Sequence, residues 1–216
     1  MLPLRLDGPA DGSLSVLAVG AHPDDIEIGA GGTLLSLAAS QPDLRAHYVV
    51  LTGTPDRQAE ADAAARAMMG DAKLTVRLHD LPEGMLPSAW ADVKAIMEEI
   101  ASSCAPDLVI GPSRYDAHQD HRTIAEILPT VFRDHLYLAY EIPKWDGDLG
   151  RPSVYFPMSA ELARRKAELL NACFPSQRGR DWWDAEVFLG LARLRGMECR
   201  APYAEAFYCA KSVFTA

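Results

Sequence analysis

Short apolar runs recur along the whole chain and are separated by longer stretches of mixed character. The runs are rich in Val, Leu, Ile and Ala and are bounded by turn residues, which is typical of buried β-strands. This pattern predicts six strands, over 14–20, 46–52, 73–78, 107–111, 136–142 and 205–210.

The stretches between these runs carry helical periodicity. In one of them Val93, Ile96, Met97 and Ile100 recur at the spacing of a single helix face. The pattern predicts six helices, over 30–40, 57–70, 88–103, 121–133, 159–172 and 182–195. Gly29-Ala30-Gly31-Gly32 is expected to form a tight turn that enters the first helix. The segment 143–157 is expected to be a surface loop over one end of the sheet, and 1–12 a loose or edge segment.

The order of these elements predicts the fold class. Strands that alternate with helices favour right-handed crossovers and a mostly parallel sheet. We therefore expect an α/β fold, a Rossmann-like three-layer sandwich with helices on both faces of the sheet. The length of 216 residues fits one domain, 1–216, and no repeat or linker divides it.

Composition narrows the class of function. A formal net charge of −9 argues against non-specific binding to nucleic acid or to an anionic membrane, because like charges repel. The chain contains no apolar run long enough for a transmembrane helix, and its first residues do not resemble a signal peptide. The four cysteines lack CxxC spacing, so we expect reduced thiols in a cytoplasmic protein.

Candidate chemistry first appears just after the first predicted strand, where 21–25 reads Ala-His-Pro-Asp-Asp. His22 and Asp25 are three residues apart across a proline turn, so both side chains can face one point. Imidazole and carboxylate suit Zn²⁺, and a catalytic zinc takes three protein ligands and a water. Asp24 would then be free to act on that water. The alternative is a polar turn that caps the next helix.

A second cluster follows the fourth predicted strand, where 115–121 reads Tyr-Asp-Ala-His-Gln-Asp-His. In an open doubly wound sheet the first and fourth strands lie side by side, and ligands bind beyond their carboxyl ends. The two clusters are therefore expected to meet in one crevice. One histidine of the second cluster would complete a three-ligand metal site.

Together, the AHPDD and HQDH motifs resemble those of the LmbE-like (PIG-L-like) zinc-dependent N-deacetylases. The resemblance implies a hydrolase that removes the N-acetyl group from an N-acetylglucosamine-type sugar conjugate. It implies the zinc ligands His22, Asp25 and His121, and Fe²⁺ also suits this ligand set. Several members of such families assemble, so a homo-oligomer remains open.

The resemblance also implies catalytic roles. Asp24 would be the general base that takes a proton from the zinc-bound water and passes it to the departing amine. His118 would stabilise the oxyanion as an imidazolium. Asp120 would orient His118 or stabilise its charge. The alternatives are an N-cap role for Asp120 and a solvated loop position for His118.

Substrate contacts are suggested on the loops after the second and third strands. The resemblance implies that Arg57 and an acidic turn residue face the sugar hydroxyls; here the turn carries Glu83 where the family commonly has Asp. The alternatives are an N-terminal helix residue for Arg57 and a plain turn for Glu83. Tyr115 and Asp116 are further candidates for substrate contact. Core or interface packing is favoured over an aromatic wall for Trp145, Trp182 and Trp183.

Two other functions compete with this one. A mycothiol-conjugate amidase would use the same residues. A metal-free, Rossmann-like nucleotide- or sugar-binding protein would need none of the metal chemistry, although 29–32 lacks the G-x-G-x-x-G spacing of a dinucleotide site.

Overall fold

The computed structural model describes residues 3, 6 and 13–213, and its centre is a seven-stranded sheet formed by these residues. The spatial order is β3-β2-β1-β4-β5-β7-β6. The first five strands in this order are parallel, and β7 runs antiparallel to both of its neighbours. The strands are β1 Ser15–Gly20, β2 Arg45–Thr52, β3 Lys73–Leu81, β4 Leu108–Pro112, β5 Leu136–Tyr140, β6 Val154–Met158 and β7 Tyr203–Tyr208.

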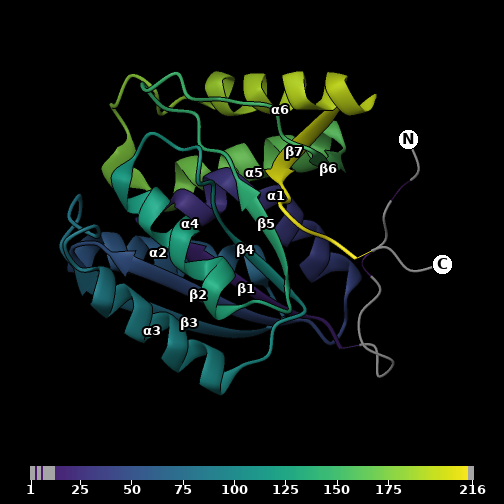
Figure 1. Cartoon of the computed structure of the whole chain (residues 1–216). Helices are drawn as coiled ribbons and strands as arrows, with labels where there is room; N and C mark the ends of the chain where they lie inside the picture. Colours follow the sequence, from purple (N-terminus) through teal and green to yellow (C-terminus); the bar gives the residue numbers. More distant parts are fainter. Residues whose placement is uncertain (1–2, 4–5, 7–12, 214–216) are drawn as a thin grey trace.

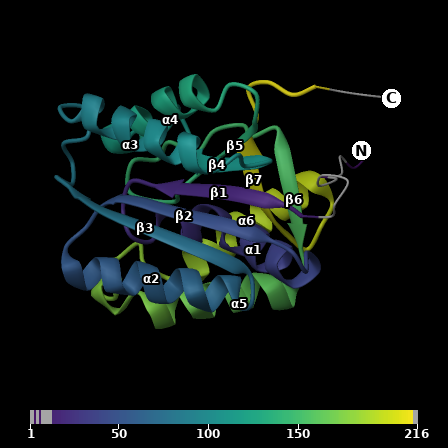
Figure 2. The same cartoon turned by 90° about the horizontal axis from the view of Figure 1, so that it is seen from below.

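Helices cover both faces of the sheet, which confirms the predicted α/β sandwich (Figures 1 and 2). One layer holds α3 and α4, and the other holds α1, α2 and α5, with α6 against β6 and β7. The helices are α1 Asp25–Ser40, α2 Pro55–Met69, α3 Trp90–Ser103, α4 Gln119–Val131, α5 Ala160–Cys173 and α6 Ala185–Cys199. None of the helices in the described part of the chain has the length and apolarity needed to span a membrane.

The central strand β1 shows how the sequence builds two cores. Its side chains alternate between the faces of the sheet, as the pleat requires. Val16 and Ala18 pack into the core under α1, α2 and α5, whereas Leu17 and Val19 pack into the core under α3 and α4. All are buried, which explains why this strand reads as an unbroken apolar run.

The glycine-rich stretch that was expected to be a turn lies inside α1, so this prediction is wrong. A Cβ at Gly29 would overlap the ring of Tyr140 on β5, and one at Gly32 would overlap the sulfur of Met158 on β6. The glycines therefore allow α1 to approach the sheet closely. Tertiary packing overrides the poor helix propensity of these residues.

The expected surface loop 143–157 also needs correction, because its end forms strand β6. Pro157 lies in this strand and cannot donate a ladder hydrogen bond. The sheet tolerates it because β6 is an edge strand that pairs only with β7. The segment 1–12, expected to be loose or an edge, lies largely outside the described residues.

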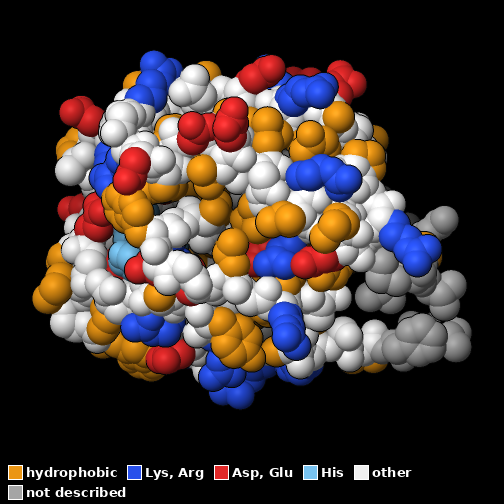
Figure 3. All heavy atoms as spheres, turned by 90° about the horizontal axis from the view of Figure 1, so that it is seen from above, with side chains coloured by type: hydrophobic (Ala, Val, Ile, Leu, Met, Phe, Trp, Pro, Cys, Tyr) orange, Lys and Arg blue, Asp and Glu red, His pale blue; other side chains and the backbone are white. Residues whose placement is uncertain are grey.

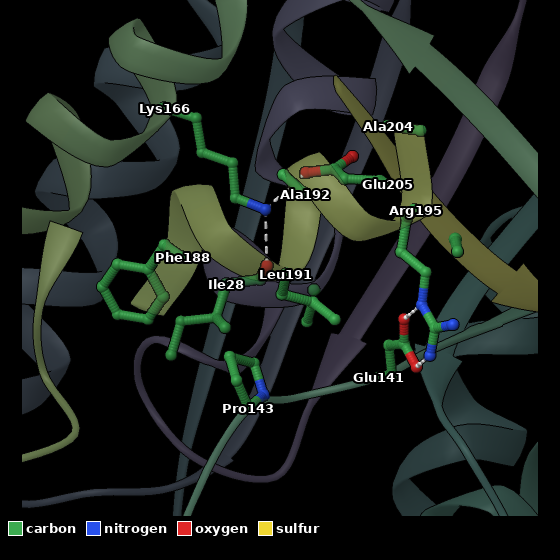
Figure 4. Close-up of a pocket in the computed structure, with 12 residues that line it drawn as sticks. Ile28, Glu141, Pro143, Lys166, Phe188, Leu191, Ala192, Arg195, Ala204 and Glu205 are labelled. Atoms are coloured by element: carbon green, nitrogen blue, oxygen red, sulfur yellow. Dashed lines mark hydrogen bonds and ion pairs between the residues drawn. The ribbon is translucent and has the colours of Figure 1, made fainter. Parts of the chain in front are cut away.

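A buried ion pair holds the middle of α1 (Figure 4). Oε1 of Glu205 on β7 lies 2.6 Å from Nζ of Lys166 on α5. The backbone N–H groups of Gly32 and Thr33 donate to the two oxygens of Glu205, each at 2.7 Å, and Lys166 donates to the carbonyl of Ile28 at 2.6 Å. In a regular helix the N–H of Gly32 would face the carbonyl of Ile28. The ion pair thus bonds to both groups, the N–H of Gly32 and the carbonyl of Ile28, and it connects α1 to β7.

Candidate active site

The two polar clusters lie at the carboxyl ends of β1 and β4. These strands are direct neighbours in the sheet, as expected, and the strand order reverses between them. His22 lies just after the end of β1, Asp25 begins α1, and His121 lies in the first turn of α4, which follows β4. The Nδ1 of His22 and the Nε2 of His121 are 3.2 Å apart. The topology therefore brings together side chains that are distant in the sequence.

Three atoms at this point form a nearly equilateral triangle. Besides the contact between the two imidazoles, Oδ2 of Asp25 lies 3.1 Å from Nε2 of His121 and 3.4 Å from Nδ1 of His22. A tetrahedral ion with ligand bonds of about 2.0–2.1 Å holds neighbouring ligand atoms roughly 3.3 Å apart. The triangle thus has the dimensions of three ligands to one divalent ion. Backbone N–H groups of Ala21 and His22 fix the orientation of the Asp25 carboxylate.

His118 is a second candidate for the third ligand. Ligand atoms of His22, His118 and His121 lie within 4.8 Å of one another. This spread is wider than the roughly 3.3 Å expected around a tetrahedral ion. In addition, Nδ1 of His118 already accepts the backbone N–H of Asp120 at 3.2 Å. Asp25 therefore fits the third position better, and His118 lines the cleft beside it.

The carboxylate of Asp120 does not make the expected orienting contact with His118, although its negative charge acts to raise the pKa of that imidazole, as the alternative role required. The Asp120 carboxylate lies 3.2 Å from Nε2 of His22 and accepts the backbone N–H groups of Gly84 and Leu86 at 2.6 and 3.0 Å. It therefore orients His22. The error arises because spacing in the sequence favoured a neighbour on the same helical turn, whereas the carboxylate points across to another loop. Asp120 is also not the N-cap of α4, since that position is His118.

Asp116 has a role that sequence reasoning missed. Its Oδ2 lies 2.9 Å from Nδ1 of His121, and its Oδ1 lies 2.9 Å from the ammonium of Lys144. A carboxylate on the outer nitrogen of a ligating imidazole fixes its tautomer and orientation. The signal was available, because Asp116 is one of the two aspartates of the second cluster, but the sequence did not pair it with His121.

Asp24 is held in an unusual state. It is the N-cap residue of α1 with φ 108°, a left-handed conformation that is rare outside glycine, and its side chain makes no capping bond. The carboxyl is buried, and Nη2 of Arg57 lies 3.1 Å from its Oδ2. Burial and the negative charge of Asp25 raise the pKa of Asp24 to about 7, while Arg57 opposes the rise. The residue can thus accept a proton near neutral pH.

In the protein without an ion, nearby carboxylates raise the pKa values of two histidines more than burial lowers them. Burial opposes the charge on His22, yet Asp25 and Asp120 outweigh it and raise its pKa to about 10. Burial is likewise outweighed at His121 by Asp25 and Asp116, which raise its pKa to about 9. Asp25 is the largest stabilising influence on both cations, and a bound divalent ion would take the place of their two protons.

Arg57 and Glu83 both lie at the cleft, and they contact each other. Nη1 of Arg57 is 3.4 Å from Oε2 of Glu83, and its Nη2 donates to the carbonyl of Pro23 at 2.7 Å. Arg57 therefore spans from the exposed Glu83 to the buried Asp24. From the sequence we predicted that Arg57 faces the substrate. That prediction did not include its contact with Asp24.

The tryptophans divide between the core and the cleft. Trp183 is only 8% exposed and packs in the core, as expected, but Trp145 is 65% exposed and lines the cleft with Trp182. The space in the cleft is about 650 Å³ when the open solvent at its mouth is included. Figure 3 shows histidine atoms in a hollow of this face. Tyr115 does not line this cleft; it packs against Tyr208 in a separate groove.

Comparison with known proteins gives consistent results. The family model PIG-L, GlcNAc-PI de-N-acetylase, matches residues 17–132, which include both clusters. The uncharacterized deacetylase YaiS of Escherichia coli (strain K12) is 30% identical over 145 residues, covering 59% of this chain and 74% of YaiS.

Solved structures share the fold. The conserved protein TT1542 from Thermus thermophilus superposes with a TM-score of 0.74 at 23% identity, over 94% of this chain and 97% of its own. The N,N'-diacetylchitobiose deacetylase from Pyrococcus horikoshii gives a TM-score of 0.66 at 19% identity, over 90% of this chain and 83% of its own. At these identities the likeness concerns the fold.

Proposed function

Because this chain belongs to the PIG-L (LmbE-like) family, we propose that it is a zinc-dependent hydrolase that removes the N-acetyl group from an N-acetylglucosamine-type sugar conjugate. The observation that carries the proposal is the triangle of His22, Asp25 and His121 beside the buried Asp24. The deacetylase activities named for YaiS and for the Pyrococcus enzyme support the reaction class. The free cysteines support a reducing, cytoplasmic environment.

The donor set fits zinc, and it would also accept Fe²⁺. When bound, the ion would acidify a coordinated water and polarise the amide carbonyl. His22 and His121 would hold the ion as neutral imidazoles, oriented by Asp120 and Asp116 on their outer nitrogens.

Asp24 would act as the general base. It takes a proton from the attacking water and returns it to the nitrogen of the leaving amine, which is a poor leaving group without it. In the protein without an ion, burial and the charge of Asp25 raise the pKa of this carboxyl, which favours its taking up a proton from the water. Arg57 would hold the carboxylate in place through the contact at 3.1 Å.

His118 would donate a hydrogen bond to the oxyanion of the tetrahedral intermediate. Its Nδ1 accepts the backbone N–H of Asp120, so its proton resides on Nε2. Burial lowers the pKa of His118, and in the protein without an ion the charges of His22 and His121 lower it further. These contacts favour a neutral imidazole as the donor, in place of the imidazolium expected from the sequence.

The test joins metal content to acetate release. Purified protein should contain about one equivalent of zinc or iron, and it should release acetate from at least one N-acetylglucosamine conjugate in a screen. Asp24→Asn should retain the metal and lose about 10²–10⁴-fold in kcat, whereas His22→Ala should lose the metal. Asp56→Asn changes an exposed carboxylate at the start of α2 and serves as the control.

Three results would contradict the proposal. Protein without a stoichiometric metal and without acetate release would favour the metal-free binding protein instead. Loss of metal from Asp24→Asn would place this carboxylate among the ligands. Full activity of the same variant would exclude it as the base.

A further inference from the structure

The strand order divides the cleft into two halves with different chemistry. The first turn of α2, which follows β2, and the loop after β3 bring Arg57 and Glu83 to one side. The loop after β5 brings Trp145 to the other side, where Trp182 joins it from the segment before α6. The metal-binding triangle after β1 and β4 lies between them, because β1 and β4 lie between β2 and β5 in the sheet. Arg57 and Glu83 thus face one half of the cleft, and the two tryptophans lie in the other half, among polar side chains that also line the cleft: Lys144, Asp146, Gln177 and Arg180.

Trp145 is exposed but fixed in place. Its Nε1 donates to Asp181 at 2.7 Å, and its ring meets Trp182 edge to face, with centroids 5.9 Å apart. Trp145 is 65% exposed and lines the cleft beside Trp182. The contacts hold the ring at the cleft when it could otherwise rotate away.

Trp145 and Trp182 together form an aromatic wall, and a series of edge-to-face ring contacts connects this wall to the core. Trp182 meets Trp183 at 5.6 Å between centroids, and Trp183 meets Phe188 at 5.3 Å and Phe174 at 5.8 Å. Such pairs prefer this geometry. The two tryptophans of the wall are therefore continuous with the core.

The loop that carries Trp145 is anchored on its other side as well. The preceding residue, Lys144, contacts Asp116 at 2.9 Å and Asp148 at 2.6 Å. Asp116 in turn contacts His121. The aromatic wall is thus connected through two residues to the metal-binding triangle, so its distance from the reacting amide is defined before a substrate arrives. Such pre-organisation lowers the entropic cost of binding.

The connectivity of the proposed substrate indicates which part of it faces each half of the cleft. In an N-acetylglucosamine conjugate the amide is on C2, whose ring neighbours are C3, with a hydroxyl, and C1, with the conjugated group. When the amide lies at the metal and the hydroxyls from C3 onward face Arg57 and Glu83, the group on C1 faces the opposite half. This assignment rests on the proposed function.

We propose that Trp145 and Trp182 form an outer subsite that binds a ring attached to C1 of the substrate. Pyranose and aromatic rings both have an apolar face that can pack on an indole, and the indole also excludes water from the contact. The subsite would make the enzyme prefer ring-bearing conjugates over those with a small group on C1.

The phenyl and methyl glycosides of N-acetylglucosamine separate this effect from catalysis, because they differ only in the group on C1. The phenyl glycoside should have a kcat/KM about tenfold higher with the metal-loaded enzyme, mainly through KM. Trp145→Ala should bring the ratio close to one, and Trp145→Phe should restore part of it. Trp90→Ala removes a tryptophan that is 45% exposed on α3 and does not line the cleft, so it should leave the ratio unchanged.

The outcomes are distinguishable. If both glycosides are hydrolysed and Trp145→Ala leaves their ratio unchanged, the subsite is wrong and the proposed function stands. If the enzyme releases acetate from neither glycoside nor any other conjugate, the proposed function is wrong and the subsite is rejected with it. Thermal unfolding of each variant, with retained metal content, shows that a change in ratio does not come from misfolding.

Discussion

Oδ2 of Asp120 lies 3.2 Å from Nε2 of His22, on the side of the imidazole that faces away from the metal-binding triangle. The same carboxylate accepts the backbone N–H groups of Gly84 and Leu86. One buried side chain therefore connects the histidine after β1 to the loop after β3. This loop also carries Glu83, so Asp120 links the position of a proposed metal ligand to that of a residue proposed to face the substrate.

Asp120→Asn should weaken metal binding. The amide has the same shape, but it cannot accept with both of its heavy atoms, so the contact with His22 or one with the loop is lost. Loss of such an outer partner costs about 10–100-fold in metal affinity. Competition with a chromophoric chelator measures the affinity. If Asp120→Asn keeps its metal affinity and loses only kcat, Asp120 acts through His118 after all.

The metal-free protein should lose stability as the pH rises. His22 and His121 have pKa values raised to about 10 and about 9 in the folded chain, against about 6.5 when unfolded. Their contribution is therefore complete below pH 6.5 and is lost as the pH rises through 9 and 10. With chelator present, the free energy of unfolding by urea should be lower at pH 9.5 than at pH 6.5 by several kcal/mol, since a difference of one pKa unit between the folded and the unfolded chain corresponds to about 1.4 kcal/mol.

The double variant His22→Gln/His121→Gln provides the control for this pH dependence. It cannot bind the two protons, so the histidine contribution to the difference between pH 6.5 and pH 9.5 should disappear. The remainder should come from the carboxyls of Asp24 and Glu27, whose pKa values burial raises to about 7 and about 8. An equally steep loss of stability in the double variant would show that other groups titrate in this range and that the histidine pair does not dominate.

Much of this architecture follows from local patterns. Apolar runs placed the strands, and the two polar clusters were expected at the ends of neighbouring strands, where His22 and His121 now lie 3.2 Å apart. The partners of these residues could not be predicted in the same way. Whether Asp120 faces His118 or His22 depends on the direction of a side chain between loops, which residue spacing on one helix does not define.

The role of the glycines in α1 was hidden for a related reason. Gly29 and Gly32 indicate a turn when only their own segment is considered. These positions require glycine because a Cβ would overlap Tyr140 or Met158, which are more than a hundred residues further along the chain. The strand β6 was missed because its proline is tolerated only at a sheet edge, and edge position is a property of the assembled sheet.

Glu205→Gln should destabilise the fold strongly. The ammonium of Lys166 is buried and contacts Glu205 at 2.6 Å, so the substitution leaves an uncompensated charge. Breaking a buried pair from one side costs about 3–5 kcal/mol. The double variant Lys166→Met/Glu205→Gln removes the charge and should recover part of this loss. Urea unfolding measures both; equal stability of Glu205→Gln and the wild type would mean that the ion pair contributes little.

The last prediction compares two glycines in helices. Gly29 in α1 faces the ring of Tyr140, whose hydroxyl donates to the carbonyl of Val19 at 2.9 Å and so cannot move aside freely. Gly190 in α6 is exposed, and a Cβ there would meet no atom within 4 Å. Alanine is the better helix former, so Gly190→Ala should stabilise the protein by about 0.5–1 kcal/mol.

Gly29→Ala gains the same helix propensity but should destabilise the protein by about 1–3 kcal/mol, because α1 must shift away from β5. Asp25 begins this helix, so the shift should also lower metal affinity, whereas Gly190→Ala should leave it unchanged. Urea unfolding and chelator competition on both variants provide the comparison. A stabilised Gly29→Ala with full metal affinity would show that the close approach of α1 to Tyr140 does not position the metal ligands.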